Sequence, residues 1–443
     1  MFLLPLILIE FYLLITLLIF AFGPVVWDIE SPYKFWFLMI CYHIAFLIGY
    51  LMSIQKNKKS VLITNELCYS NKLNNFMQKY FWIYLFIAFV GTLISYKNAC
   101  HTNSYIPYNL FLDFYYGIIS PDAVRDKFLN SFDSYQSNKV VTIFYSSIAF
   151  IKFSLIPILV FLWNRLNTIQ KAIGLFISLI PFMGTVSIGT NKLILDTLVI
   201  FSLSLFIHLL SIKKGNRFKE LSQRKTILIL IISFTLFFPF YFNKSMSERN
   251  SNFQYMETVS KENAIKIPFY SSSNKSDIVS PKIMEFYIKV STYLTQGYYG
   301  MSLALDEKFD STYGIGHSYF LLDQFKYFFN IDLIERTYQF KVHDEWDRLV
   351  QWHSFYSQVA NDVGFYGLIF IMFILGYLLS SIYISAIRDN NIIAKTLLPL
   401  FAIMFIYMPA NNQIFNFMET MFSFWVLLFL WLLSKRFEKR EVC

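Results

Sequence analysis

Charge and cysteine are both scarce in this 443-residue sequence. Charged residues make up 15% of the chain and hydrophobic residues 56%, with a mean hydropathy of +0.46. This composition excludes an ordinary soluble protein and is typical of polytopic helical membrane proteins. The four cysteines stand far apart without CxxC spacing, at Cys41, Cys68, Cys100 and Cys443. A disulfide framework or a cysteine metal site is therefore not expected.

Sequence signatures of common enzyme sites are also missing. The chain has no HExxH, no Walker A loop, no GxSxG elbow and no metal-spaced cluster of ligands. We therefore expect no metal and no cofactor, and hydrolysis by a standard acid-and-nucleophile site is not supported. Internal repeats and low-complexity tracts are absent as well, which argues against a transporter built from repeated halves.

Apolar runs long enough to cross a bilayer dominate the chain. A span needs roughly 17–25 residues, because unpaired backbone groups cannot be left in hydrocarbon. The sequence predicts an all-α polytopic membrane protein with about ten transmembrane helices. The predicted spans are 3–22, 35–54, 80–96, 141–163, 172–188, 193–212, 226–242, 363–387, 396–412 and 415–433. The first span lacks a cationic lead and a cleavage site, so we expect it to be retained.

Positive charge in the short loops predicts the orientation. With a cytoplasmic N-terminus, the inner loops and the C-terminal tail hold 19 Lys and Arg, whereas the short outer loops hold 2. This asymmetry predicts cytoplasmic termini and places two long segments, 97–140 and 243–361, outside the cytoplasm. The predicted organisation is a bundle of about seven helices over 1–242, the large outer loop 243–361, and about three helices with a cytoplasmic tail over 362–443.

The charges of the large outer loop argue against nucleic-acid binding as the reason for the basic net charge. Its 12 Lys and Arg against 14 Asp and Glu give −2, so most of the net charge of +9 belongs to cytoplasmic loops. Three apolar-rich stretches, 105–119, 281–305 and 318–329, are predicted to be amphipathic helices at the membrane interface. Ser280–Pro281 would begin the second of these helices.

Outer arginines are the first candidates for binding a ligand. Guanidinium groups bind phosphate bidentately and stay charged, so they suit a pyrophosphate-linked lipid. The candidates are Arg125, Arg249, Arg336 and Arg348, and the alternative for each is a solvated ion pair. His317 and His353 are candidates for a general base or a phosphate donor, although a lone outer histidine is more often a packing residue.

Charged side chains are also predicted at membrane depth. Lys152 and Glu10 lead this group, in which a structural ion pair is as plausible as a function. Lys192 and Asp196 stand four residues apart and could pair locally. In the first outer loop, Asp28 and Glu30 could instead serve as the acidic base of an enzyme that uses polyprenyl-phosphate sugars, or simply be solvated.

Three stretches resemble the bacterial O-antigen polymerases of the Wzy type. They are GTNKLILDTLVIF at 189–201, YLTQGYYGMSLAL at 293–305 and WHSFYSQVANDVGFYGLIFIMFILGYL at 352–378. The resemblance implies a GT-C-like membrane glycosyltransferase fold in the bacterial inner membrane. It also implies an activity, the transfer of a growing polysaccharide from undecaprenyl pyrophosphate onto a lipid-linked repeat unit. Donor and acceptor would both be lipid-linked glycans, with a chain-length regulator and a flippase as further partners.

Candidate roles follow from that chemistry. Arg249, Arg336 and Arg348 would stabilise the leaving pyrophosphate, with His353 as the base and His317 or Asp362 as weaker options. Arg125, Lys192 and Tyr298 would bind substrate. The family typically has Arg at the position of Lys192, so the bidentate contact is lost here. Asp362 and Gly364 could alternatively cap the helix of the next span. An O-antigen ligase, another polyprenyl-linked-sugar transferase and a lipid-linked glycan transporter remain as alternatives.

Overall fold

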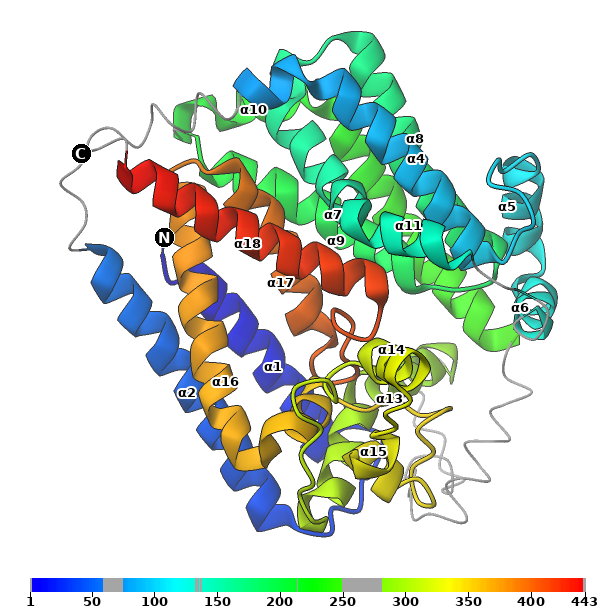
Figure 1. Ribbon diagram of the computed structural model, residues 1–443, viewed down its shortest axis with the longest axis vertical. Helices are drawn as coiled ribbons and strands as arrows, with labels where there is room; N and C mark the ends of the chain where they lie inside the picture. Colours follow the sequence, from blue (N-terminus) through cyan, green and yellow to red (C-terminus); the bar gives the residue numbers. More distant parts are fainter. Residues whose placement is uncertain are drawn as a thin grey trace. The chain divides into compact units, whose positions relative to one another are not determined.

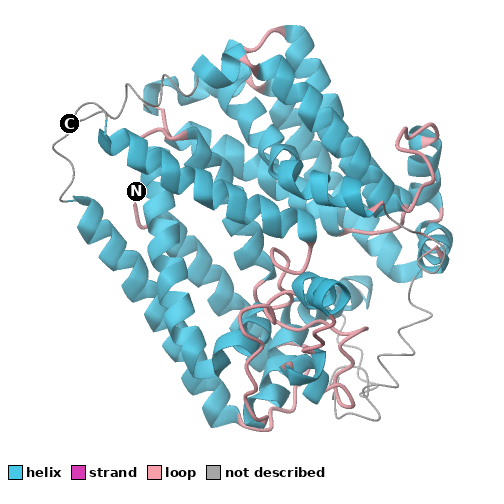
Figure 2. Ribbon diagram, in the orientation of Figure 1, coloured by secondary structure: helices cyan, strands magenta, loops and turns pink. Residues whose placement is uncertain are grey.

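The computed structural model describes residues 2–58, 75–131, 135, 138–212, 214–248 and 281–440. These residues form helices joined by loops, with no strand among them (Figure 2). The all-α prediction is therefore confirmed for the described part of the chain. Arg249 and Ser280 lie outside the described residues, so the predictions made for them are not addressed.

Nine described helices are long and apolar enough to cross a membrane, which identifies a multi-pass membrane protein. They are α1 (Leu4–Phe22), α2 (Pro32–Lys58), α4 (Phe81–Cys100), α7 (Lys139–Leu162), α8 (Thr168–Ser187), α9 (Lys192–Leu210), α11 (Lys225–Glu248), α16 (Phe355–Ile387) and α18 (Met418–Arg440) (Figure 1). The remaining predicted span, 396–412, corresponds to α17 (Ile392–Tyr407), a shorter apolar helix. Each predicted span thus has a helix, and boundaries differ by several residues.

Helices also form in the segments predicted to lie outside the spans. The stretch 105–119 contains α5 (Leu110–Ile119), 281–305 contains α13 (Pro281–Leu303) and 318–329 contains α14 (Tyr319–Phe329). Ser318 caps α14, because its hydroxyl accepts a hydrogen bond from the Leu321 N–H at 3.2 Å. One side of α13 packs against α1.

The chain divides into two compact units. Unit 1 comprises residues 1–61, 252–381 and 401–418, and unit 2 comprises 62–251, 382–400 and 419–443. Both α16 and α17 contribute to each unit. The boundary predicted at 361, between the outer loop and the helices that follow it, does not separate the two units. The segment before α16 packs with the helices of unit 1.

A close helix crossing organises unit 1. A Cβ built on Gly49 of α2 would lie 2.0 Å from the Phe373 carbonyl oxygen, and one on Gly376 of α16 would lie 2.1 Å from the Phe46 carbonyl oxygen. Neither position has room for a side chain. Small residues allow such backbone contact between membrane helices, where van der Waals packing replaces the hydrophobic effect.

Four helices form the interior of unit 2. α4, α7, α8 and α9 pack against one another around an apolar cluster that includes Phe81, Leu155 and Leu159. α8 starts at a capping box, in which Asn167 and Gln170 satisfy each other's backbone N–H at 2.8 and 3.1 Å. This reciprocal cap explains why α8 begins four residues before the predicted span.

Candidate functional site

The carboxylate of Asp362 organises a tight loop of unit 1. It accepts hydrogen bonds from Thr312 Oγ1 at 2.5 Å, from the backbone N–H groups of Gly314, Gly316 and His317 at 2.9, 2.8 and 3.0 Å, and from His317 Nδ1 at 2.9 Å. We call residues 311–318 the Asp362 loop. The cap predicted for Asp362 is replaced by this longer-range role, in which the carboxylate holds a separate loop.

Asn361 attaches two further segments to the same point. Its side-chain amide donates to the Gly316 carbonyl at 2.9 Å and to Gln339 Oε1 at 2.7 Å, while its Oδ1 accepts from the Tyr338 N–H at 2.9 Å. Its carbonyl oxygen accepts from the Thr312 hydroxyl at 2.9 Å. Asn361 is fully buried, so each of these bonds is protected from water.

His317 is held with one ring nitrogen toward Asp362 and part of its ring exposed. The carboxylate can only accept, so Nδ1 carries the hydrogen of this contact and Nε2 is the basic nitrogen. The ring edge meets Phe415 with centroids 5.2 Å apart, and the side chain is 18% exposed. Asn412 donates to the His317 carbonyl at 2.8 Å. The histidine is therefore fixed in position, as a general base must be.

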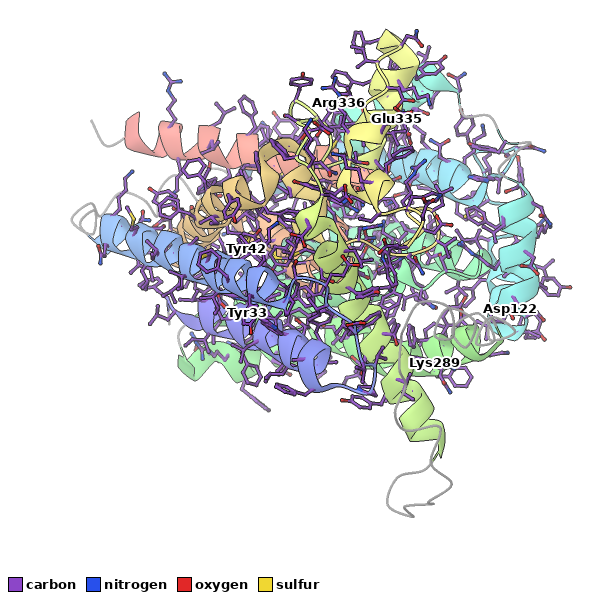
Figure 3. The ribbon with its side chains drawn as sticks, turned by 90° about the horizontal axis from the view of Figure 1, so that it is seen from below. Tyr33, Tyr42, Asp122, Lys289, Glu335 and Arg336 are labelled. Carbon is purple, nitrogen blue, oxygen red and sulfur yellow. The ribbon has the colours of Figure 1, made fainter. Side chains whose placement is uncertain are left out.

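Arg336 lies on the solvent side of the same loop. Its guanidinium donates to Tyr313 Oη at 3.1 Å and to the Ser311 carbonyl at 3.4 Å, and it stacks 5.4 Å from the Tyr313 ring centre. Figure 3 labels Arg336 beside Glu335, and both side chains are exposed. Among the described residues no carboxylate pairs with Arg336, so the solvated ion pair considered from the sequence is absent there.

Arg348 lies in the same unit and interacts electrostatically with Asp323. Its guanidinium lies 5.9 Å from the Phe340 ring centre. Burial raises the pKa of Asp323 above its ordinary value, and the charge of Arg348 opposes that rise. Within the described part of the chain Arg348 forms no ion pair, and a long-range attraction to Asp323 is its clearest electrostatic contact.

His353 and Tyr298 lie in the interior of unit 1. His353 is 2% exposed, and burial lowers its pKa to about 3. The Tyr298 hydroxyl hydrogen-bonds Thr16 Oγ1 at 3.0 Å, and the ring is fully buried. A base must come within hydrogen-bond reach of its proton. This burial favours packing roles for both residues and makes His317 the better placed imidazole.

Asp28 and Glu30 are exposed in the first outer segment of unit 1. Partial burial raises the pKa of Glu30, and the nearby charges of Glu345, Asp306 and Asp28 raise it further. The pair therefore belongs to an acidic surface. Its chemistry suits a solvated patch as well as it suits a base.

Arg125 and Lys192 occupy one end of unit 2. Arg125 belongs to α6 (Pro121–Asn130) and lies 5.5 Å from the Phe128 ring centre. A Cβ on Gly189 would come within 3.0 Å of the Arg125 Cβ, so the turn before α9 packs directly on α6. Lys192 is the first residue of α9. The structure thus brings the two predicted outer loops of unit 2 together at these cations.

Ion pairs account for several charges predicted at membrane depth. Lys152 Nζ lies 2.6 Å from Glu419 Oε2 and donates to Ser95 Oγ at 2.6 Å. In unit 1, Glu10 lies 2.6 Å from His43 Nδ1. Pairing offsets the cost of placing charge in hydrocarbon, as anticipated from the sequence.

Within the described ranges no group of three or more His, Cys, Asp or Glu is placed to hold a metal ion. Comparison with protein-family models, curated proteins and solved structures finds no match to this chain.

Proposed function

We propose that this protein polymerises undecaprenyl-pyrophosphate-linked oligosaccharide repeat units into O-antigen polysaccharide at the periplasmic face of the bacterial inner membrane. The resemblance of three stretches to Wzy-type polymerases supports the proposal, as does the multi-pass helical architecture. One observation carries the choice of site: Asp362 holds His317 at 2.9 Å within a loop that also positions an exposed arginine. His317 and Arg336 both belong to the segment 243–361, which is predicted to lie outside the cytoplasm.

In the proposed reaction, Nε2 of His317 takes the proton of an acceptor sugar hydroxyl. The hydroxyl oxygen forms a bond to the anomeric carbon of the growing glycan, and the bond from that carbon to the pyrophosphate oxygen breaks. Undecaprenyl pyrophosphate leaves with its electron pair. Asp362 is a positioning residue that fixes the imidazole tautomer and stabilises the imidazolium, much as the aspartate of a catalytic triad does.

Arg336 is the proposed electrostatic partner of the leaving group. A preorganised cation beside the developing charge lowers the barrier more than a solvated one, because it needs no reorganisation. Arg348 lies in the same unit and can add to the positive field. Arg125 and Lys192 belong to unit 2 and keep their roles as sequence-based candidates. Arg249 keeps its role as a sequence-based candidate.

Deleting the gene in a strain with smooth lipopolysaccharide tests the proposed function. Loss of a polymerase should leave core carrying a single repeat unit. Loss of a ligase should leave no repeat units on the core, and loss of a transporter should trap lipid-linked repeat units at the cytoplasmic face. A normal lipopolysaccharide ladder in the deletion strain would contradict the polymerase and these alternatives together.

Point variants then test the site. His317→Ala should reduce polymer by about 100-fold or more, the usual contribution of a general base. Arg336→Ala should also reduce it, with partial recovery in Arg336→Lys. His343→Ala and Lys326→Ala, which change exposed side chains of the same unit, are matched controls. Lipopolysaccharide gels at equal membrane abundance measure the effect. A full ladder from His317→Ala would refute the assigned base while leaving the deletion result to judge the function.

A further inference from the structure

A cavity of about 360 Å³ opens inside unit 2, and the Asp362 loop contributes no residue to its lining. Its walls come from the end of α7, the end of α9, α10 (Arg217–Gln223) and the segment 387–395. This volume is more than ten times the roughly 30 Å³ that one water molecule occupies in the liquid. Titratable lining side chains are Arg165, His208, Glu220, Arg224, Arg388 and Lys395.

Two of the lining cations are neutralised internally. Arg224 is 1% exposed and pairs with Glu220 one helical turn earlier. The guanidinium of Arg388 contacts both carboxylate oxygens of Asp389, at 2.5 and 3.2 Å. Glu220 also lies 3.4 Å from His208 Nε2. The acidic groups at the cavity are therefore already committed to these contacts.

Lys395 is a buried amine with no carboxylate partner among the described residues. Its side chain is 4% exposed, its ammonium donates to Asn390 Oδ1, and it lies 5.3 Å from the Phe161 ring centre. No carboxylate in the described part of the chain forms an ion pair with it. A buried cation paired only with an amide and a ring carries a large desolvation cost, which an anion in the cavity would offset.

Arg165 supplies a second uncompensated charge at the edge of the same cavity. It is exposed and donates to Asn75 Oδ1 at 2.9 Å, with no ion pair to a described carboxylate. A buried ammonium and an exposed guanidinium on one cavity match a phosphate group, which accepts from both kinds of donor. Apolar walls from Phe161, Leu162 and Ile392 lie alongside these cations.

We propose that this cavity binds a phosphate group through Lys395 and Arg165. Arg165, Glu220 and Lys395 of its lining belong to the predicted loops 164–171, 213–225 and 388–395, whose charge predicts a cytoplasmic position. The phosphate can then come from an anionic phospholipid of the inner leaflet or from a soluble phosphate ester, since both present the same oxygens. The site is separate from the proposed glycan chemistry and does not depend on it.

Binding by the purified full-length protein tests this site. In the lipid arm, native mass spectrometry measures retention of phosphatidylglycerol against phosphatidylcholine in nanodiscs containing both. In the soluble arm, thermal unfolding in neutral detergent measures stabilisation by inorganic phosphate against chloride at equal ionic strength. In the arm in which the wild-type protein binds, we expect Lys395→Gln and Arg165→Gln each to weaken binding by about tenfold. This is the effect of one lost charge-assisted hydrogen bond.

Lys219→Gln is the matched control, because it removes one exposed positive charge from α10 without touching the cavity. Lys395→Arg should retain binding. Since Arg165 is exposed, its variant keeps the test informative if Lys395→Gln unfolds. An effect in the lipid arm alone identifies a headgroup, and an effect of inorganic phosphate identifies a site open to soluble esters. The proposal is overturned if neither arm responds, or if Lys219→Gln weakens binding as much as the cavity variants.

Discussion

At the scale of single residues, the contacts of Asp362 explain how an irregular loop is held. Tyr313 has a positive φ of 56°, which costs a non-glycine residue energy, and Gly314 follows with φ of 88°. The Asp362 carboxylate accepts from the backbone N–H of Gly314, inside this turn, and from that of Gly316, just after it, and so stabilises the turn. The sequence identified both His317 and Asp362 as candidates. It could not pair them, because 45 residues separate the two and no local pattern encodes that contact.

Because sequence alone does not reveal long-range contacts, the sequence analysis chose His353 over His317 as the base. This histidine lies in the segment before the D-x-G motif of Asp362 and Gly364. A residue in an irregular segment has no periodicity that would reveal its burial. Gly300 shows what surrounds it: a Cβ there would lie 3.1 Å from His353 Nδ1 and 2.8 Å from Trp346. Such packing arises from α13, more than 50 residues away, so only the folded chain displays it.

Acid should destabilise the protein through His353. Burial lowers its folded-state pKa to about 3, whereas the unfolded value is about 6.5. The unfolded chain therefore binds a proton between these values, and the stability is complete above pH 6.5 and declines as the pH falls below it. By pH 5 the loss should reach about 2 kcal/mol. Thermal unfolding of wild type and His353→Leu at pH 7.5 and pH 5 measures this, and an equal acid response in both proteins would contradict it.

At the scale of elements, α16 is two helices joined by a bend. Gly364 has φ 70° and ψ 167° inside the helix, and Figure 1 shows the change of direction. The predicted span began at 363, close to this bend, because hydropathy rises there. The helical turns before Gly364 were not predicted, since their polar residues Ser357, Gln358 and Asn361 do not resemble a span. They are buried by neighbouring segments of unit 1.

Gly364→Ala should straighten or strain this bend. An added Cβ would meet only Phe309, at an ordinary 3.6 Å, so the cost comes from the backbone conformation. That conformation is essentially restricted to glycine, and forcing it on alanine costs about 1–3 kcal/mol. We expect a lower Tm and less polymer, because Asp362 stands two residues before the bend. Gly215→Ala, with no atom within 4 Å of its Cβ, is the control. Equal Tm values for both variants would show that the bend is not under strain.

At the scale of the whole molecule, the helix count and the fold class followed from composition and length alone. Backbone N–H and C=O groups must be hydrogen-bonded within hydrocarbon, so a long apolar run has few alternatives to a helix. Nine described helices meet the length and hydropathy expected of spans, and the shorter helix α17 corresponds to the remaining predicted span, 396–412. The division into two units was not predicted, because it depends on contacts between segments such as 252–381 and 401–418 that are distant in the sequence.

Orientation is the whole-molecule property on which the proposed chemistry depends, since lipid-linked repeat units are joined outside the cytoplasm. The 19 to 2 distribution of loop cations predicts that Glu335 faces the periplasm and Ser222 the cytoplasm. Both side chains are exposed, so each can report its side as a single cysteine. In a background with all four native cysteines changed to Ser, Glu335→Cys should react with an impermeant maleimide in cells with a permeabilised outer membrane. Ser222→Cys should react only after the inner membrane is opened. The reverse pattern would place the Asp362 loop in the cytoplasm, where the proposed polymerase could not meet its substrates.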